Sequence, residues 1–334
     1  MTEGAVLALT MGEPAGIGGE LTLMAWLARR EQAVPPFLVI DDPGRLRALA
    51  RRLGLEVPVA EIDTAAQAAA RFDQALPVLT LPVAVAVEPS RPDPANGRAV
   101  LASIDRAVAL TLAGSTSAVV TNPIHKGVLY KAGFRHPGHT EYLGALVGVA
   151  TPVMMLEGAG LRVVPVTCHL SVRQALASLT SEMIIRWGRI TAAALVRDFG
   201  IKAPRLAVAG LNPHAGENGA MGDEEVTIIA PAIAALRADG VAVSGPHSAD
   251  TLFHAQARAR YDAALCMLHD QALIPLKTLA FDSGVNITLG LPIVRTSPDH
   301  GTAFDLAGSG GADPASLIAA LYTAARLAAT RAGA

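Results

Sequence analysis

Short apolar runs alternate with longer segments of helical periodicity along the whole chain. Most of the short runs are apolar throughout, as in strands of a parallel sheet that is covered on both faces. Such runs, separated by helical segments, are typical of an α/β fold with helices on both sides of a mostly parallel sheet. The pattern therefore predicts a three-layer α/β/α architecture with a largely parallel sheet.

The expected strands are aliphatic or β-branched: Ala5–Thr10, Phe37–Asp41, Val83–Val87, Ala118–Thr121, Val153–Leu156, Arg162–Thr167, Arg205–Gly210, Ala263–Leu268, Val285–Leu289 and Ile293–Arg295. The expected helices have an apolar stripe: Glu20–Arg30, Arg45–Leu53, Gly97–Ala113, Thr140–Val147, Ser181–Phe199, Asp223–Ala238 and Pro314–Ala332. A left-handed glycine is expected to end five of them, at Gly54, Gly114, Gly148, Gly200 and Gly240. The connection Glu157–Gly160 predicts a hairpin, and Pro231 predicts a break in its helix.

Length, charge and cysteine content narrow the class of protein. The 334 residues suit two domains or one large unit. The net charge is -2 without a run of like charges, which argues against a nucleic-acid or anionic-membrane partner. The longest apolar stretch, Ala75–Val87, contains two prolines and is too short to span a bilayer. Cys168 and Cys266 form no CxxC motif, so we expect neither disulfides nor a cysteine-ligated metal, and a cytoplasmic location.

Three histidines share one position relative to the expected strands, since His169, His214 and His269 each follow an apolar run. The carboxyl ends of parallel strands meet at one edge of a sheet, where three imidazoles could share a divalent metal ion. Asp270 and Asp250 could add a ligand or orient an imidazole. Capping or simple hydrogen bonding is the alternative for each residue alone. The shared placement favours the metal site.

A second set of residues has the composition of an anion site. Lys277, Asn286 and Arg295 lie near the ends of short segments. Arginine binds a phosphate or carboxylate through two N–H groups, lysine adds a charge and asparagine an amide donor. Gly138–Glu141 opens an expected helix, whose free N–H groups also favour an anion. Solvated surface charge is the alternative for the cations, and a simple N-cap for Thr140.

The glycine-rich segment Met11–Glu20 lies between an expected strand and an expected helix. Glycine there allows the backbone to approach a ligand or a neighbouring strand. The spacing is neither GxGxxG nor GxxxxGK[ST], so it predicts neither a Rossmann dinucleotide fingerprint nor a P-loop. The chain also lacks a GxSxG elbow, which disfavours a serine hydrolase.

Several long, dispersed blocks carry a family resemblance: MGEPAGIGGE, TNPIHKG with GHTEYL, VTCHLSVR, LNPHAGENGAMGDEE, CMLHDQALIPLK and GVNITLGLPIVRTSPDHGTAFDLAG. Over residues 6 to 322 the chain resembles the 4-hydroxythreonine-4-phosphate dehydrogenases of pyridoxal phosphate biosynthesis. Its HGTAFDLAGSGGADPAS block also resembles the cofactor loop of the isocitrate and isopropylmalate dehydrogenases. Those enzymes bind a dinucleotide without GxGxxG.

The resemblance implies roles for individual residues. It implies that His169, His214 and His269 bind a divalent metal ion such as zinc, magnesium or cobalt. It implies that the phosphorylated substrate binds to His139, Thr140, Lys277, Asn286 and Arg295. The cofactor, NAD or NADP, is expected near His300, Gly301, Thr302, Ala303 and Asp305.

The resemblance also implies an organisation. One domain is expected to combine residues 1–125 with 296–334, the other to contain residues 126–295, and the active site to lie in the interdomain cleft. A homodimer is expected to complete the metal site across its interface. Three positions depart from the family pattern: Glu13 replaces a more frequent aspartate, Gly19 a proline, and Ser283 an arginine whose loss could weaken phosphate binding or shift specificity.

The implied reaction is oxidation of 4-phosphohydroxy-L-threonine by NAD, followed by decarboxylation to 3-amino-2-oxopropyl phosphate. The metal ion is expected to act as the Lewis acid in both steps. His169, His214, His269, Lys277 and Asp270 are the expected catalytic residues, with Asp270 or a metal-bound water as the base. A dehydrogenase of phosphothreonate or phosphoerythronate would share these residues. A metal-dependent hydrolase and a non-catalytic phosphometabolite-binding protein are further alternatives, both excluded by direct NAD binding.

Overall fold

A computed structural model describes residues 6–333 of the chain. The chain divides into two compact units. The first unit comprises Met1–Pro152 with Leu291–Ala329, and the second comprises Val153–Gly290 with Thr330–Ala334. Ala5, the expected start of the first strand, lies outside the described residues together with residues 1–4 and 334.

The boundary between the units falls at Pro152 rather than at the expected residue 125. The reason is apolar packing, because side chains that follow residue 125 join a core cluster with residues from the start of the chain. Leu129 and Phe134 are buried in that cluster beside Met11 and Val100. Residues 126–152 are therefore part of the first unit.

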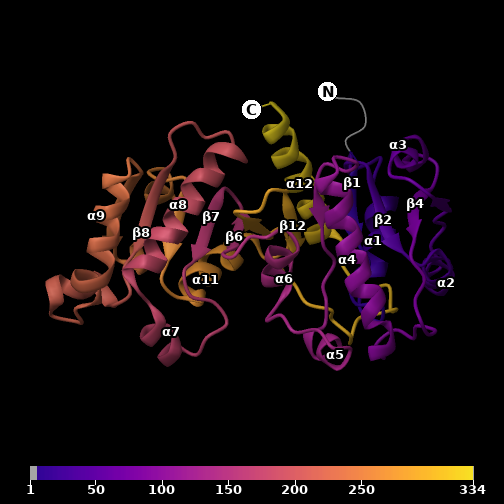
Figure 1. The fold of residues 1–334 in the computed structure, drawn as a ribbon, viewed down its shortest axis with the longest axis horizontal. Helices are drawn as coiled ribbons and strands as arrows, with labels where there is room; N and C mark the ends of the chain where they lie inside the picture. The colour runs from indigo at the N-terminus through magenta and orange to yellow at the C-terminus, as the bar shows by residue number, and fades with distance from the viewer. Residues whose placement is uncertain (1–5, 334) are drawn as a thin grey trace. The chain divides into compact units, whose positions relative to one another are not determined.

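The sheet of the first unit is entirely parallel in its described pairings. The strand order is β3 (Val59–Ile62), β4 (Leu76–Thr80), β2 (Phe37–Asp41), β1 (Leu7–Thr10), β5 (Val119–Val120) and β12 (Arg295–Pro298). The helices of this unit (Figure 1) are α1 (Gly18–Leu27), α2 (Pro43–Leu53), α3 (Ala66–Phe72), α4 (Gly97–Leu112), α5 (Lys126–Lys131), α6 (His139–Leu146) and α12 (Ala315–Gly333).

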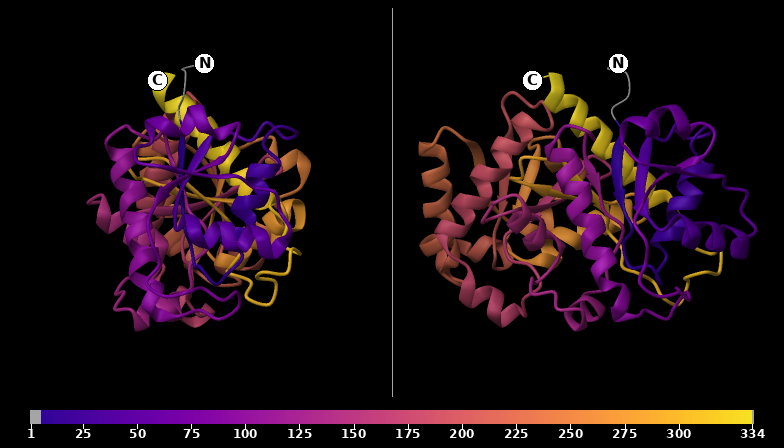
Figure 2. Two further views of the ribbon diagram at one scale, coloured as in Figure 1. Left: turned by 90° about the vertical axis from the view of Figure 1, so that its right-hand side faces the viewer. Right: turned by 45° about the vertical axis from the view of Figure 1, so that its right-hand side comes forward.

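Both faces of this sheet are covered. Ala8 and Ile40 belong to a core cluster with residues of α3 and α4 on one face. Leu9 and Val39 point to the other face, because side chains alternate along a strand, and they are fully buried as well. Figure 2 shows helices on both sides of the sheet. This double burial explains why the strands are apolar throughout.

The second unit has a mixed sheet. Its strand order is β11 (Val285–Leu289), β6 (Val153–Gly158), β7 (Leu161–Pro165), β10 (Ala263–Cys266), β8 (Arg205–Ala209) and β9 (Ala242–His247). β6 is antiparallel to β11 and β7, whereas β7, β10, β8 and β9 run parallel to one another. The helices of this unit are α7 (Val172–Ser178), α8 (Ser181–Arg197), α9 (Ala230–Ala238), α10 (Ala255–Arg258) and α11 (His269–Ala280).

The predicted fold class is confirmed, and most expected elements are present. The expected hairpin joins β6 to β7, with its two loop residues, Ala159 and Gly160, at positive φ. All five glycines expected at helix ends have positive φ. Pro231 is the second residue of α9, which directly follows a π-helical turn at Glu225–Ile229, so the predicted break is also confirmed.

The expected strand Val83–Val87 is wrong, since this segment is an irregular loop. Side chains take the place of a neighbouring strand as hydrogen-bond partners: Asp42 accepts from Val83 N, and Asn96 exchanges two bonds with the backbone of Val85. Strands β3, β4 and β9 and the helices α3, α5, α7, α10 and α11 were not expected from the sequence.

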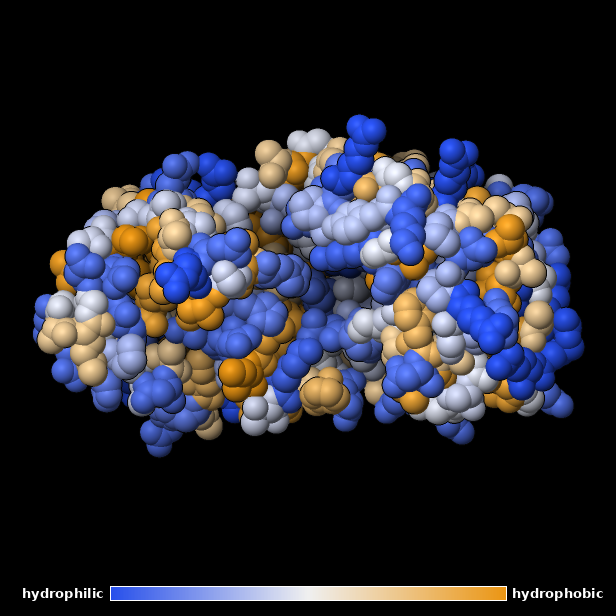
Figure 3. All heavy atoms as spheres, turned by 90° about the horizontal axis from the view of Figure 1, so that it is seen from below, coloured by the Kyte–Doolittle hydropathy of each residue, from blue (hydrophilic) through white to orange (hydrophobic). Residues whose placement is uncertain are grey.

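Across residues 6–333, no helix is both long enough and apolar enough to cross a membrane. In the view of Figure 3, hydrophilic residues cover much of each unit and apolar residues are scattered among them.

Candidate active site

The three candidate metal ligands follow three adjacent parallel strands of the second unit. His169 follows β7, His269 follows β10 and His214 follows β8. β10 pairs with β7 on one side and with β8 on the other, both in parallel register. The three residues therefore share the carboxyl edge of this sheet, as the sequence predicted.

Two of the three imidazoles lie close together. The ring centroids of His169 and His269 are 6.0 Å apart, with an angle of 44° between the ring planes. Both line a cavity of about 220 Å³ together with Thr167 and Asp270. Nδ1 of His269 lies 2.8 Å from Oδ1 of Asp270. This contact orients the ring and leaves Nε2 as the nitrogen available to a ligand.

His214 stands apart from this pair. Its side chain is 64% exposed, and its Nδ1 lies 3.9 Å from a carboxylate oxygen of Glu217. Among residues 6–333, no three histidine, cysteine or acidic side chains gather closely enough to hold a metal ion. The structure thus brings together His169 and His269 but not the expected third ligand.

The pair fits a divalent ion as part of a ligand set. Two imidazoles at this separation can bind one ion through one nitrogen each, and a carboxylate behind a histidine is a common second layer of a metal site. Imidazole suits zinc or cobalt better than magnesium, which prefers oxygen. His169 and His269 would therefore hold such an ion, with Asp270 orienting His269.

Backbone strain marks the same edge. His169 and His214 have φ of 51° and 54°, in the left-handed region that residues other than glycine rarely adopt. Each costs about 1–2 kcal/mol relative to an ordinary conformation. Such residues cluster at functional sites, where the surrounding structure holds them.

The expected substrate residues of the first unit surround the start of α6. His139 and Thr140 are its first two residues, and Gly138 is its N-cap. Nε2 of His139 is buried without a hydrogen-bond partner. Burial, together with the charges of Arg295 and Lys126, holds the pKa of His139 well below its usual value. The ring is therefore neutral at neutral pH and lies in a positive field.

Arg295 begins β12 and is buried. Its Nη2 donates to Oγ1 of Thr121 over 2.6 Å, and burial lowers its pKa to about 10. It remains a cation at neutral pH. A buried cation beside a neutral imidazole and the free N–H groups of a helix N-terminus suits an anionic ligand.

The other two expected substrate residues belong to the second unit. Lys277 lies in the last turn of α11, and Asn286 is the second residue of β11, opposite Leu156. Oδ1 of Asn286 is buried without a hydrogen-bond partner, which leaves it available to a ligand donor. Ser283, where the family pattern has arginine, is exposed in the turn between α11 and β11.

The expected cofactor loop, His300–Asp305, is anchored to the glycine-rich loop of the first unit. The carbonyl oxygen of Thr302 accepts from Ile17 N over 3.0 Å. The rings of Phe304 and His125 are 5.1 Å apart. A Cβ at Gly16 would lie 2.9 Å from the Thr302 carbonyl oxygen, so glycine is needed for this approach.

Two departures from the family pattern lie in the glycine-rich segment Met11–Glu20. Glu13 is buried, which raises its pKa, while the N–H of Ala15 and the charge of Arg45 act in the opposite direction. A Cβ at Gly19 would lie 2.9 Å from a guanidinium nitrogen of Arg45. Gly19 thus leaves room for that guanidinium.

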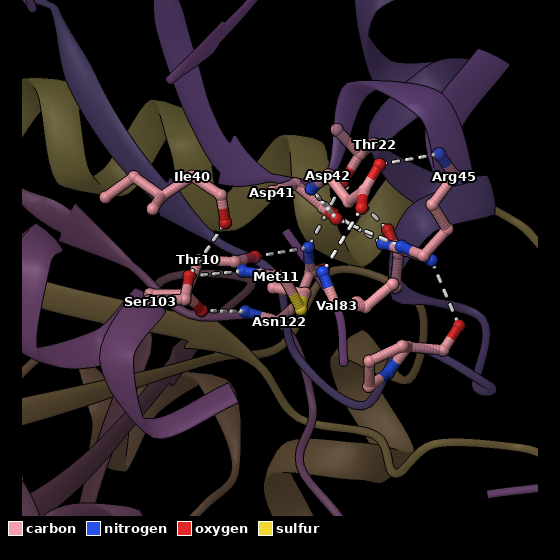
Figure 4. Close-up of polar contacts among 12 residues, drawn as sticks. Thr10, Met11, Thr22, Ile40, Asp41, Asp42, Arg45, Val83, Ser103 and Asn122 are labelled. Atoms are coloured by element: carbon pink, nitrogen blue, oxygen red, sulfur yellow. Dashed lines mark hydrogen bonds and ion pairs between the residues drawn. The ribbon is translucent and has the colours of Figure 1, made fainter. Parts of the chain in front are cut away.

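A buried polar network supports the glycine-rich loop (Figure 4). Ser103 Oγ donates to the carbonyl oxygen of Ile40 and accepts from Met11 N, over 2.8 and 2.9 Å. Asn122 Nδ2 donates to the carbonyl oxygen of Thr10 over 2.9 Å. These bonds join the carboxyl ends of β1, β2 and β5.

Sequence reasoning missed several of these supporting residues. Lys126 acts on His139 through space, and Ser103 bridges two strands that are far from it in the sequence. Glu225, described below, begins a turn that was expected to be an ordinary helix. For Glu225 there was one signal in the sequence: it forms an adjacent acidic pair with Glu224 inside an apolar helix pattern.

Comparisons with known proteins show which family this chain resembles. A family model described as pyridoxal phosphate biosynthetic protein PdxA matches residues 33–324. A protein of Bradyrhizobium diazoefficiens named 4-hydroxythreonine-4-phosphate dehydrogenase is 55% identical, with 97% of each chain covered. One of the same name from Methylorubrum populi is 57% identical, with 96% of this chain and 94% of that protein covered. A crystal structure of the same-named enzyme from Klebsiella pneumoniae is 38% identical with a TM-score of 0.88, covering 98% of each chain.

Proposed function

The chain belongs to the family of the pyridoxal phosphate biosynthetic protein PdxA, and from this premise we propose that it oxidises and decarboxylates 4-phosphohydroxy-L-threonine. It is an oxidoreductase of pyridoxal phosphate biosynthesis. The family implies a nicotinamide cofactor and a divalent metal ion. The product of the proposed reaction is 3-amino-2-oxopropyl phosphate, with NAD as the oxidant.

The observation that carries the proposal is the His169–His269 pair beside Asp270, at the edge of three parallel strands. When bound, the metal ion would supply Lewis-acid activation and the dinucleotide would accept the hydride. His169, His269 and His214 are the proposed metal ligands. Asp270, with its carboxylate exposed, is the proposed general base.

The remaining residues bind and orient the substrate. Arg295 and Lys277 are proposed to hold its phosphate and carboxylate, and Thr140 and Asn286 to hydrogen-bond to it. Neutral His139 would donate or accept a hydrogen bond without adding a charge to the site. His300–Asp305 are proposed to bind the dinucleotide, which is NAD or NADP. We also propose a cytoplasmic homodimer in which a second copy completes the metal site.

A second substrate is favoured by one observation. Ser283 replaces the arginine that is frequent in the family, in the turn that leads to Asn286. A lost cation there would alter the preference for charged groups on the substrate. Phosphothreonate is therefore the competing substrate, with the same metal and cofactor chemistry.

The test is NADH formation by the purified chain from each substrate, with added divalent metal and with a chelator. Metal-dependent NADH from 4-phosphohydroxy-L-threonine, at a higher kcat/KM than from phosphothreonate, supports the proposal. A preference for phosphothreonate would change the substrate and retain the chemistry. No NADH from either substrate would contradict the assignment as a dehydrogenase.

A further inference from the structure

The loop that carries His214 has an unusual backbone. Five consecutive residues, from His214 to Asn218, have positive φ between 43° and 76°, with ψ between -2° and 52°. This is a left-handed helical turn, and four of its five residues are not glycine. L-amino acids visit this region as single residues rather than as runs, because the Cβ crowds the following carbonyl. The neighbouring structure must therefore hold the turn in place.

One buried carboxylate binds the entry to this turn. Oε1 of Glu225 accepts from Leu211 N and from Asn212 N, each over 2.7 Å. Its Oε2 accepts from Asn212 Nδ2 over 2.8 Å. Glu225 is only 3% exposed, so these bonds are shielded from competing water.

The same carboxylate also packs against the turn itself. A Cβ at Gly216 would lie 2.6 Å from Oε2 of Glu225, so a side chain there would displace this carboxylate. Glu225 opens the π-helical turn Glu225–Ile229, and such turns occur frequently at functional sites. A hydrogen bond also connects the start of this loop to α11, since Gln271 Nε2 donates to the carbonyl oxygen of Gly210 over 2.9 Å.

We infer that Glu225 is a positioning residue for His214: it holds the left-handed turn in the conformation that presents the exposed imidazole at the carboxyl edge of the sheet. Glu225 touches neither the His169–His269 pair nor their cavity by any described contact. Its effect on a metal ion would pass through His214. This inference rests on the proposed function, in which His214 is a metal ligand.

The experiment measures cobalt binding by the full chain, because the visible absorption of cobalt reports the number and type of its ligands. Four variants are compared with the wild type: Glu225→Ala, His214→Ala, the double variant, and Glu224→Ala as a matched control. Glu224 is the neighbouring acid and accepts one bond from Asn212 Nδ2 over 2.7 Å, but none from the backbone N–H groups of Leu211 or Asn212 in the described contacts.

Glu225→Ala is expected to weaken cobalt binding about tenfold and to change its spectrum as His214→Ala does. Because both act on the same ligand, the double variant should bind no more weakly than His214→Ala. Glu224→Ala should remain within about twofold of the wild type. Hydrogen exchange of the Leu211 and Asn212 amides should accelerate in Glu225→Ala, since they lose their acceptor.

If Glu225→Ala does not fold, Glu225→Gln takes its place. Gln keeps one acceptor oxygen for the two backbone N–H groups but turns a donor toward Asn212. Glu225→Gln is therefore expected to weaken cobalt binding about threefold, and to have no further effect when His214 is already replaced by Ala. Wild-type cobalt binding in the Glu225 variants, alongside a weakened His214→Ala, would overturn only this inference. Unchanged binding in His214→Ala would overturn the ligand assignment of the proposed function, and the inference with it.

Discussion

The carboxyl edges of the two sheets are built in different ways. At the edge of the first unit, buried side chains bind the ends of neighbouring strands to one another, as Ser103 and Asn122 do for β1, β2 and β5. Arg45 forms a buried ion pair with Asp41 and donates to the carbonyl oxygen of Pro14. At the edge of the second unit, two of the three candidate ligands have left-handed backbones, and His214 is largely exposed.

The difference distinguishes residues that stabilise the fold from residues that are available to bind a ligand. A buried network with matched donors and acceptors stabilises the loops that it holds. A strained residue with an exposed imidazole contributes less to stability and is available to a ligand. We therefore expect substitutions at the first edge to reduce stability, and substitutions of the histidines at the second edge to reduce ligand binding while stability stays level or rises.

The largest effect is expected at Arg45. Arg45→Met leaves the carboxylate of Asp41 buried without its cation, which should lower the free energy of unfolding by about 3–5 kcal/mol. Denaturant unfolding measures this. Arg47→Met on the same helix breaks an ion pair with Glu61 in which the side chains are 39% and 52% exposed, and should cost about 0.5 kcal/mol or less. Equal losses of unfolding free energy in the two variants would contradict a larger contribution from the buried ion pair.

The next effect is a dependence of stability on pH. The pKa of His139 is lowered in the folded state, so the unfolded state binds a proton first as the pH falls through its own pKa of about 6.5. Stability from this residue is present above that pH and is lost below it, by at most about 1.4 kcal/mol per pH unit. Between pH 7 and pH 5, His139→Gln should lose less stability than the wild type.

The matched substitution for this test is His254→Gln, at an exposed histidine of the second unit. It should leave the pH dependence of the wild type unchanged. The same slope in all three proteins would contradict the buried, neutral state of His139.

A smaller effect of opposite sign is expected at His214. His214→Gly removes the steric cost of a left-handed residue and should raise the free energy of unfolding by about 0.5–1 kcal/mol while weakening metal binding. His214→Ala keeps the Cβ, and with it the strain, so its stability should stay near that of the wild type. Thermal unfolding and metal titration of both variants test this. A destabilised His214→Gly would show that the turn is not strained.

The smallest effect concerns Lys126. Its charge contributes to the low pKa of His139, so Lys126→Met should raise that pKa. Titration of the His139 ring by NMR measures the change. Lys131→Met, at the exposed far end of the same helix, is the control and should leave the titration unmoved.

The fold was predictable where local signals and tertiary structure agree. Phe37–Asp41 and Val285–Leu289 have the bounds expected from their apolar runs. The segment Val83–Val87 is also apolar, but it pairs with no strand, and Asp42 and Asn96 form hydrogen bonds with its backbone instead. Helix α11 was not expected, because it contains Pro275 and a proline inside a segment normally argues against a helix.

The site was predictable as far as strand order could be inferred. Histidines after three parallel strands do reach one edge, which the spacing indicated. The sequence could not show that His169 and His269 pair while His214 stands on a left-handed turn, because that turn depends on contacts with Glu225. Nor could it show the charges around His139, which come from residues far away in the chain.

The most direct test of the account is calorimetric binding of zinc and of NAD to the same samples of wild type and His269→Ala. The metal ion is expected at the histidine edge of the second unit, and NAD on the His300–Asp305 loop of the first. His269→Ala should therefore lose zinc binding and retain NAD binding. Unchanged zinc binding in that variant, or no NAD binding by the wild type, would contradict it.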